Sequence, residues 1–438
     1  MNILFVSKEL NGGNLSNILQ QEGNSLKLYI EDEKQKRVLN NIVPKTDDWE
    51  KELDWVGKNG LIVFDDTGYG KRQDELRKEG YNVFGGSELG EKIELDRFFA
   101  NTIFHKYGLP TTDIISFSNL KDAVDYMKKN PASWVTKQDD AHYPKTLNYV
   151  GKFDNGHDVI DLLETYCQSN NTANRKITIQ KRLKGIEIGV GRYFNGNDWV
   201  GPLEVNLEHP YMFGHKNCPC VDEMGTLAWF EKKPEKNKLY METMAKLKPF
   251  LIEADFRGDI SLNCIITEEG PFILEATARI GSPIVHLQEE LQTVRWTDLL
   301  ISIAKGEQID VTFKKGFGVV TLIATPPYPY EPNSESKLLE GAKIYLDDLT
   351  EEERKSIHLG DVAMREVDGE KILHIQDCTG YIAYVTSVHK NISKARKRID
   401  SIINKIHIPR MFYRDDIGLN FEKEERKKLK KLGYFKRL

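Results

Sequence analysis

Glu275, Thr277 and Arg279 stand on alternate residues directly after a short apolar segment at 272–274. Side chains two apart on a β-strand point to the same side, so a strand here would present a carboxylate, a hydroxyl and a guanidinium in a row. Carboxylate and hydroxyl oxygens are ligands for Mg²⁺, and a guanidinium binds phosphoryl oxygens. Taken alone, the pattern indicates either a site for a metal ion and a phosphate or an ordinary surface ion pair.

A second group of residues has the types that a nucleotide needs. Lys137 is expected to end a strand and Lys145 to follow in the next loop, so two cations could meet the phosphates of a nucleoside triphosphate. Residues 180–183 leave another predicted strand, whose free backbone N–H and C=O groups could pair with an adenine edge. Glu187 could accept hydrogen bonds from ribose hydroxyls. The order of these residues, with Glu275 last, favours a nucleotide site.

The elements that must position these side chains define an α/β fold. Strands expected at 2–6, 26–30, 60–64 and 82–84 alternate with helices at 14–21 and 71–79, which is typical of a doubly wound parallel sheet. A long helix at 91–107 ends at Gly108 and Pro110. A smaller α/β unit follows at 112–185, with strands at 133–137 and 177–180 and a helix at 158–167. Further helices are expected at 235–252 and 393–405, and strands at 260–267 and 272–274.

Composition limits the class of protein. The chain of 438 residues is too long for one compact core and indicates about two to four domains. A hydrophobic content of 39% and a charged content of 29% describe an ordinary soluble protein, and the net charge of -5 argues against nucleic acid or a membrane surface as a partner. The N-terminus reads as a strand and not as a signal peptide. Five cysteines form no disulfide framework, so the expected compartment is the reducing cytoplasm.

The chain resembles the ATP-grasp superfamily, in which ATP is held between two α/β subdomains, and within it the phosphoribosylamine–glycine ligases. Residues 83–87 through 108–111 are similar to that family's linker and first ATP-grasp helix, residues 317–320 to the start of its C-terminal domain, and residues 412–418 to its closing segment. The resemblance implies a Rossmann-like N-terminal domain at 1–95, a two-subdomain ATP-grasp domain at 96–310 with a lid at about 112–185, and a β-rich mixed α/β domain at 311–438. A monomer or a homodimer is expected.

The resemblance also implies roles for the candidate residues. Those that would contact ATP are Arg97, Lys137, Lys145, Gln180, Lys181, Arg182, Leu183 and Glu187. Those that would bind Mg²⁺ or Mn²⁺ are Glu275, Thr277 and Asn263, and those that would act on the transferred phosphoryl group are Arg279 and Lys145. The implied reaction joins a small-molecule carboxylate to an amine through an acyl phosphate, with release of ADP and phosphate.

Departures from the family pattern fall in the lid, the metal strand and the substrate pocket. The lid loop at 138–145 contains no glycine, has two acids and includes Pro144, which cannot donate a backbone hydrogen bond. Thr277 stands where the family has asparagine, and Ser282 to Ile284 replace its pocket acids. The Gly12–Gly13 pair lacks the Arg-Glu-His that follows it in the family. We therefore expect substrates that differ from glycine and phosphoribosylamine.

Two other functions stay open. A non-catalytic, nucleotide-binding descendant acting as a sensor or scaffold would explain the glycine-free lid. A genuine phosphoribosylamine–glycine ligase of purine biosynthesis would explain the overall resemblance. Two smaller patterns also have alternatives: Gly12–Gly13 fits a phosphate cradle or a plain tight turn, and the group His209, His215, Cys218 and Cys220 fits a zinc site less well than a substrate-covering loop.

Overall fold

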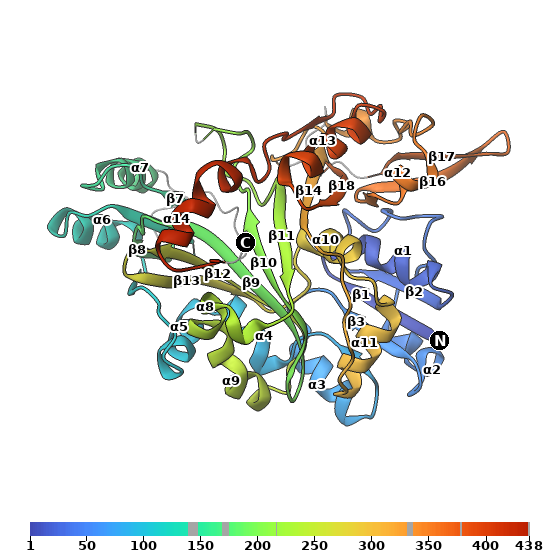
Figure 1. Ribbon diagram of the computed structural model, residues 1–438, viewed down its shortest axis with the longest axis horizontal. Coiled ribbons are helices and arrows are strands. Elements are labelled where there is room, and N and C mark those ends of the chain that lie inside the picture. The colour runs from blue at the N-terminus through green and yellow to red at the C-terminus, as the bar shows by residue number, and fades with distance from the viewer. Residues whose placement is uncertain (139–147, 169–174, 216, 331–335, 377–378, 437–438) are drawn as a thin grey trace. The chain divides into compact units, whose positions relative to one another are not determined.

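The computed structural model describes residues 1–138, 148–168, 175–215, 217–330, 336–376 and 379–436 (Figure 1). The chain divides into two compact units. One comprises residues 1–109, 187–264 and 275–438, and the other comprises residues 110–186 and 265–274. Each is described by itself. The division into three domains that the resemblance implies stays a prediction.

The N-terminal sheet has the strand order β2-β1-β3-β4, and all its strands are parallel. Strand β1 pairs with β2 on one side and β3 on the other, and its residues Ile3, Leu4, Phe5 and Val6 are fully buried. The predicted doubly wound parallel sheet is confirmed. Its elements are β1 (Asn2–Ser7), α1 (Gly13–Gln21), β2 (Ser25–Ile30), η1 (Glu50–Glu52), α2 (Leu53–Val56), β3 (Leu61–Phe64), α3 (Gly70–Lys78) and β4 (Val83–Phe84).

Two helices replace the single long helix predicted at 91–107. They are α4 (Glu88–Leu95) and α5 (Arg97–Lys106), and the break falls at Asp96, whose backbone is extended. The Asp96 carboxylate accepts hydrogen bonds from the backbone N–H groups of Phe98 and Phe99, both at 3.0 Å. Aspartate satisfies the free donors of a helix start better than it supports a helix interior, so it begins a new helix here.

The second unit is a small sheet covered on one face by two helices. The strand order is β5-β8-β6-β7 and the pairing is antiparallel. Helices α6 and α7 pack on the face that carries Trp134, Ile177 and Ile179. Its elements are β5 (Ile114–Phe117), α6 (Leu120–Lys129), β6 (Trp134–Gln138), β7 (Tyr149–Val150), α7 (His157–Cys167) and β8 (Ile177–Lys181).

A large, mostly antiparallel sheet carries most of the acidic side chains considered below. Figure 1 shows β9, β10 and β11 in green side by side, and the strand order is β13-β12-β9-β10-β11-β14-β18-β15, with β19 paired to β14. A turn at 195–198 closes the β9–β10 hairpin. The strands are β9 (Ile186–Asn195), β10 (Trp199–Glu208), β11 (Gly225–Glu231), β12 (Arg257–Thr267), β13 (Gly270–Thr277), β14 (Phe317–Ala324), β15 (Ile357–Leu359), β18 (Tyr381–His389) and β19 (Phe412–Tyr413).

Helices and short elements complete the chain. The helix predicted at 235–252 is interrupted at Thr243, where the backbone leaves the helical region, and Pro249 lies in the first turn of the last piece, where no N–H is needed. These elements are η2 (Pro234–Lys236), α8 (Lys238–Glu242), η3 (Met244–Leu247), α9 (Lys248–Glu253), α10 (Ile284–Leu291), α11 (Trp296–Lys305), η4 (Ser336–Leu339), α12 (Glu351–Arg354), β16 (Val362–Val367), β17 (Glu370–Ile375), α13 (Ile392–Ile403), the π-helical turn η5 (Phe421–Glu425) and α14 (Arg426–Lys431).

Helix α11 receives its N-terminal cap from the far end of the chain. The Glu22 carboxylate accepts hydrogen bonds from the backbone N–H groups of Trp296 and Thr297, both at 2.8 Å. Arg295 adds a hydrogen bond from its guanidinium to the Glu22 carbonyl at 2.8 Å. A carboxylate at this end also complements the helix dipole, so the contact ties α1 to α11. Within the described residues, no helix has the length and apolar character needed to cross a membrane.

Candidate active site

Polar residues alternate along three neighbouring strands of the large sheet. They are Glu204, Asn206 and Glu208 on β10, Asp259, Ser261 and Asn263 on β12, and Glu187 on β9, where glycines occupy the next two positions of the same face, 189 and 191. Residues two apart share a face, and Asn206 lies opposite Gly189, as Glu204 lies opposite Gly191. We call this set the polar face. Strand β9 lies between β12 and β10, and two of its three positions on this face are glycine. The acids and amides of β10 and β12 therefore have room to approach each other over β9.

The two residues proposed to bind metal from neighbouring strands are linked through a third acid. Asn263 is buried on β12, and its Nδ2 donates a hydrogen bond of 2.9 Å to Oε1 of Glu208. Glu275 is exposed near the end of β13, and its charge acts on Glu208. Thr277 is the last residue of β13 and is partly exposed. Glu208 therefore joins the predicted site as an acid that the sequence did not single out.

The electrostatics of Glu208 show that carboxylates converge here. Burial first, and then the nearby carboxylates of Glu187 and Glu275, raise the pKa of Glu208 to about 7 against the hydrogen bond from Asn263, which lowers it. The pKa of Glu223 is also raised, by burial first and then by Glu208. We call Glu187, Glu208 and Glu275 the carboxylate cluster. Like charges held together disfavour ionisation, and a bound cation removes that penalty.

The space above Gly189 supports the assignment of an oxygen-ligand site. A Cβ atom at this position would lie 2.2 Å from Oδ1 of Asn206 and 2.8 Å from Oδ1 of Asn263, so both amide oxygens point over the glycine. Within the described chain, Oδ1 of Asn206 is buried and has no hydrogen-bond partner. Carboxylate, amide and hydroxyl oxygens are the ligands that Mg²⁺ prefers, so the donor set fits the predicted ion.

Arg279 is held by two acids from the N-terminal part of the chain. Its Nε donates to Oε1 of Glu94 at 2.8 Å and lies 3.4 Å from Oδ1 of Asp66. The other oxygen of Glu94 accepts the backbone N–H of Ala278 at 2.7 Å. Burial opposes the charge, but Glu94 and Asp66 raise the pKa of Arg279. The guanidinium is thus fixed in place beyond the end of β13 and stays charged.

Two acids follow the carboxyl end of β3, beside the carboxyl end of β1, where the strand order of the N-terminal sheet reverses. The carboxylate of Asp65 accepts hydrogen bonds from the Ser7 hydroxyl at 2.9 Å and from the Gly12 N–H at 2.8 Å. Asn11 donates to Asp66 at 2.9 Å. Ligands of open α/β sheets bind at such a reversal. Gly12 and Gly13 form a tight turn here, and the N–H of Gly12 that a phosphate would need is taken by Asp65.

In the second unit, two of the predicted nucleotide contacts share a face. Lys137 lies opposite Thr178, and Gln180 is two residues along from Thr178, so both side chains lie on the face opposite Trp134, Ile177 and Ile179. The backbone N–H of Arg182 donates to Ser133 at 2.8 Å, and its guanidinium donates to the Gly151 carbonyl at 2.9 Å.

The other residues predicted to contact ATP lie at different places in the chain. Lys181 ends β8 and is exposed, and Leu183 follows it and is partly exposed. Arg97 is the first residue of α5, directly after the Asp96 cap. Lys145 and the acids of the lid loop lie outside the described residues.

The group that could have bound zinc does not assemble. His209 accepts a hydrogen bond from the backbone N–H of Gly418 at its Nε2, at 2.9 Å. Cys218 donates to the carbonyl of His215 at 2.9 Å, within its own loop. In the part of the chain that the structure describes, these side chains do not converge as metal ligands do.

Three comparisons with known proteins identify the class. Residues 95–284 match the model of the phosphoribosylglycinamide synthetase ATP-grasp (A) domain. A curated phosphoribosylamine–glycine ligase from Listeria innocua is 23% identical over 355 residues, which cover 80% of this chain and 81% of the relative. The solved phosphoribosylamine–glycine ligase of Thermotoga maritima superposes with a TM-score of 0.67 at 17% identity, over 95% of this chain and all of that one.

A third relative bears on the cofactor. The biotin carboxylase domain of the Hydrogenobacter thermophilus 2-oxoglutarate carboxylase was solved with MgADP, ADP and bicarbonate. It superposes with a TM-score of 0.61 at 13% identity, over 94% of this chain and 91% of that chain. The fold and the matched segment define an ATP-grasp enzyme of the ADP-forming ligase class. Within that class the chain is phosphoribosylamine–glycine ligase-like. The predicted fold class is confirmed, and the match to an ATP-grasp domain agrees with the predicted binding of ATP.

Several residues of the site were missed, although the sequence holds a signal for them. Glu204, Asn206 and Glu208 alternate within an otherwise apolar run, which indicates a polar face on a strand. Asp65 and Asp66 directly follow the apolar run at 61–64, and acids at the carboxyl end of a parallel strand are candidates for a ligand site. Glu94 carries no comparable signal, because its contact with Arg279 spans 185 residues.

Proposed function

We propose that the protein joins a carboxylate to an amine at the expense of ATP, through an acyl phosphate, and that its substrates differ from glycine and phosphoribosylamine. The fold and the retained residues support the reaction type. The departures at 282–284 and around Gly12 support the change of substrate.

Each residue of the site has a proposed task. Lys137, Lys145 and Arg97 would bind the nucleotide, with adenine against residues 180–183 and ribose against Glu187. Mg²⁺ would be held by oxygens of Glu275, Glu208, Asn263 and Thr277, and it would offset the negative charge that gathers on the transferred phosphoryl group. Arg279, fixed by Glu94 and Asp66, would bind the phosphoryl oxygens and orient them toward the attacking carboxylate.

The observation that carries the substrate proposal is the acid pair at the carboxyl end of β3, beside the end of β1. Asp65 and Asp66 lie where ligands bind in such sheets, and Asp65 occupies the N–H of Gly12. Burial and the neighbouring Asp66 raise the pKa of Asp65 to about 7. An anion such as a phosphate ester would meet repulsion there, whereas an ammonium group would be attracted. We infer that this position binds the amine substrate as its ammonium ion, without a phosphate beside it, and that the ammonium gives up a proton before its nitrogen attacks the acyl phosphate.

The genuine phosphoribosylamine–glycine ligase activity is the second candidate. It is favoured by the named relatives, which cover most of the chain. The two candidates differ in what the N-terminal acids must bind, so one experiment separates them.

The test is a phosphate-release assay coupled to mass spectrometry. The protein receives ATP and Mg²⁺ with a panel of amino acids and amines, phosphoribosylamine and simple diamines included. We expect phosphate release that depends on one acid and one non-phosphorylated amine, and a product of summed mass minus water. Asp66→Asn should raise KM for the amine about tenfold, and Asp54→Asn on the exposed surface of the same region, which should leave it unchanged, is the control.

Two other results would contradict the proposal. Turnover confined to glycine and phosphoribosylamine would establish the second candidate. ATP binding without turnover on any pair would favour the non-catalytic function.

A further inference from the structure

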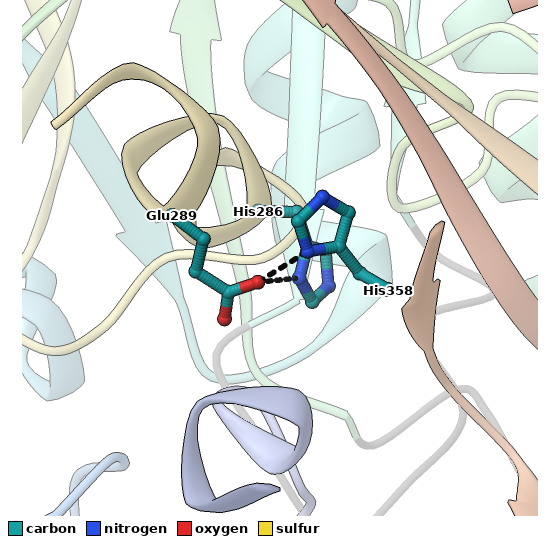
Figure 2. Close-up of side chains that lie close together, drawn as sticks. All are labelled: His286, Glu289 and His358. Carbon is teal, nitrogen blue, oxygen red and sulfur yellow. Dashed lines mark hydrogen bonds and ion pairs between the residues drawn. The ribbon is translucent and has the colours of Figure 1, made fainter. Parts of the chain in front are cut away.

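Two histidines and a glutamate meet inside the larger unit, and none of them has a task in the proposed reaction. His286 and Glu289 lie three residues apart on α10 and therefore share a face of that helix. His358 is the middle residue of β15, and Figure 2 shows its ring beside that of His286, with the Glu289 carboxylate directed at both. We call these three residues the histidine cluster.

The three side chains converge on one oxygen atom. Oε2 of Glu289 lies 3.2 Å from Nδ1 of His286 and 2.5 Å from Nδ1 of His358. One possible ligand atom from each side chain lies within 4.8 Å of the other two. The exposed fraction is 2% for His286 and 4% for His358, and the Glu289 side chain is 1% exposed. The cluster is therefore closed to bulk water.

Hydrogen bonds on the far side of His358 define which nitrogen carries its proton. Nε2 of His358 lies 2.9 Å from the Thr386 hydroxyl, which itself donates to the Ser356 carbonyl at 3.4 Å. A hydroxyl has one hydrogen, so it accepts from His358, and Nε2 carries the proton. In the neutral ring the Nδ1 lone pair then faces the Glu289 carboxylate. Two acceptors in contact need a cation between them.

Asn14 of helix α1 supports the same assignment. Its Nδ2 lies 2.9 Å from Oε2 of Glu289 and 3.4 Å from Nδ1 of His358, so an N–H donor faces both atoms. Its Oδ1 accepts the backbone N–H of Leu359 at 3.0 Å, which fixes the orientation of the amide. Metal-binding histidines and carboxylates are commonly oriented by such outer contacts, from a hydroxyl or an amide that touches the ligand and not the ion.

The second oxygen of Glu289 distinguishes a metal ion from a proton. Oε1 is buried and, within the described chain, has no hydrogen-bond partner. A proton on either imidazole leaves that oxygen unsatisfied, at a cost of about 1–3 kcal/mol. An ion bound by both carboxylate oxygens and both Nδ1 atoms would satisfy four donor atoms at once.

We propose that His286, Glu289 and His358 bind a divalent transition-metal ion, and that Zn²⁺ is the expected occupant. Two imidazoles and a carboxylate are ligands of Zn²⁺ and of neighbouring metals, whereas Mg²⁺ prefers oxygen ligands alone. The closed surroundings leave no position for a reacting water, so the ion has a structural task. It joins α10 to β15 and, through Asn14, to α1.

The first test is the metal content of the full-length protein. Protein loaded with Zn²⁺ in the presence of excess Mg²⁺ is dialysed and analysed by mass spectrometry for metals, and one zinc per chain is expected. His286→Gln and His358→Gln should each lose the zinc, and His407→Gln, an exposed histidine, should keep it. No zinc in the wild-type protein, or stoichiometric zinc in both cluster variants, would overturn the proposal.

A second measurement keeps the proposal testable if the variants do not fold. Wild-type protein loaded with Co²⁺ should show the visible ligand-field bands of a four-coordinate nitrogen and oxygen site. A Cys218→Ser, Cys220→Ser double variant should give the same spectrum. Intense near-ultraviolet charge transfer from thiolate to cobalt, lost in the double variant, would move the ion to the 209–220 loop and refute the assignment.

Discussion

The carboxylate cluster and the histidine cluster are both built around one glutamate, and they place it in opposite surroundings. Glu208 has other acids nearby, and burial with their charges raises its pKa to about 7. Burial alone would also raise the pKa of Glu289, but without a metal ion the imidazoles of His286 and His358, when protonated, lower it to about 2. The first cluster consists of oxygen atoms and includes the exposed Glu275, whereas the second contains nitrogen atoms and is closed.

The difference shows how one chain can separate two metal ions. An exposed set of oxygen ligands suits Mg²⁺, which would arrive and leave with each nucleotide. A closed set that includes imidazoles suits Zn²⁺ that stays bound as part of the structure. Position along the sequence does not produce this separation, because Glu275 and His286 are only eleven residues apart. The end of β13 and the start of α10 place them on different elements.

The largest effect is expected from Glu275→Gln, which removes the charge and keeps the shape. Phosphate release should fall by about 10³-fold, since the amide binds a divalent cation poorly where charge develops. Zinc content should not change, which would separate the two clusters functionally. Steady-state kinetics measures the loss, and Glu269→Gln in the exposed β12–β13 turn is the matched control. A variant that retains a tenth of the rate would show that Glu275 is not the essential ligand.

A smaller effect is expected from Gly189→Ala on the polar face. The added Cβ would lie 2.2 Å from Oδ1 of Asn206 and 2.8 Å from Oδ1 of Asn263, so both amides must move. The free energy of unfolding should drop by about 2–3 kcal/mol, and more Mg²⁺ should be needed for turnover. Denaturant unfolding measures the first quantity and Mg²⁺ titration the second.

Gly86→Ala is the control for this variant, because its nearest contact would be 3.6 Å. An unchanged unfolding midpoint in Gly189→Ala would mean that the amides are not packed over the glycine. Zinc content should again be unaffected.

The smallest effect is expected on the pH dependence of stability and concerns His209. This histidine has no carboxylate as close to it as Glu289 is to the rings of the histidine cluster. Burial and the Arg414 guanidinium lower its pKa to about 4, against a weaker opposite effect of Asp416. The folded protein therefore keeps the ring neutral while the unfolded chain binds a proton below pH about 6.5. Stability from this group is complete above that pH and is lost as the pH falls toward 4.

For this partly exposed ring the loss should be about 1–2 kcal/mol, which is less than full burial would give. His209→Gln retains an acceptor for the Gly418 N–H and should flatten the fall between pH 6.5 and 4, as measured by urea unfolding at several pH values. His407→Gln should leave the profile unchanged. An identical pH profile for His209→Gln would show that the ring already titrates normally.

Local patterns in the sequence predicted the elements well. Alternation of apolar strands and helices indicated the parallel sheet, and the spacing of Glu275, Thr277 and Arg279 correctly indicated a strand end. The break at Asp96 was missed because apolar periodicity continues across it, although aspartate favours a helix start. The proposed tasks of the site residues stay predictions.

Contacts between distant residues could not be predicted. The hydrogen bond from Asn263 to Glu208 spans 55 positions, and the contact between His358 and Glu289 spans 69. Each depends on how strands and helices are brought together by packing, and a single sequence carries no direct signal for that. The i,i+3 spacing of His286 and Glu289 was visible, but nothing local pointed to His358 as the third member.

The cap that Glu22 supplies to α11 has a consequence for dividing the protein into pieces. A fragment that begins after residue 24 leaves the first amides of α11 without their carboxylate, and a fragment that ends before residue 295 leaves Glu22 without its donors. Each fragment lacks one side of this hydrogen-bonded contact and carries the other side. Co-expressed halves of the chain should therefore reassociate, and a circularly permuted chain that keeps both segments should tolerate new ends elsewhere.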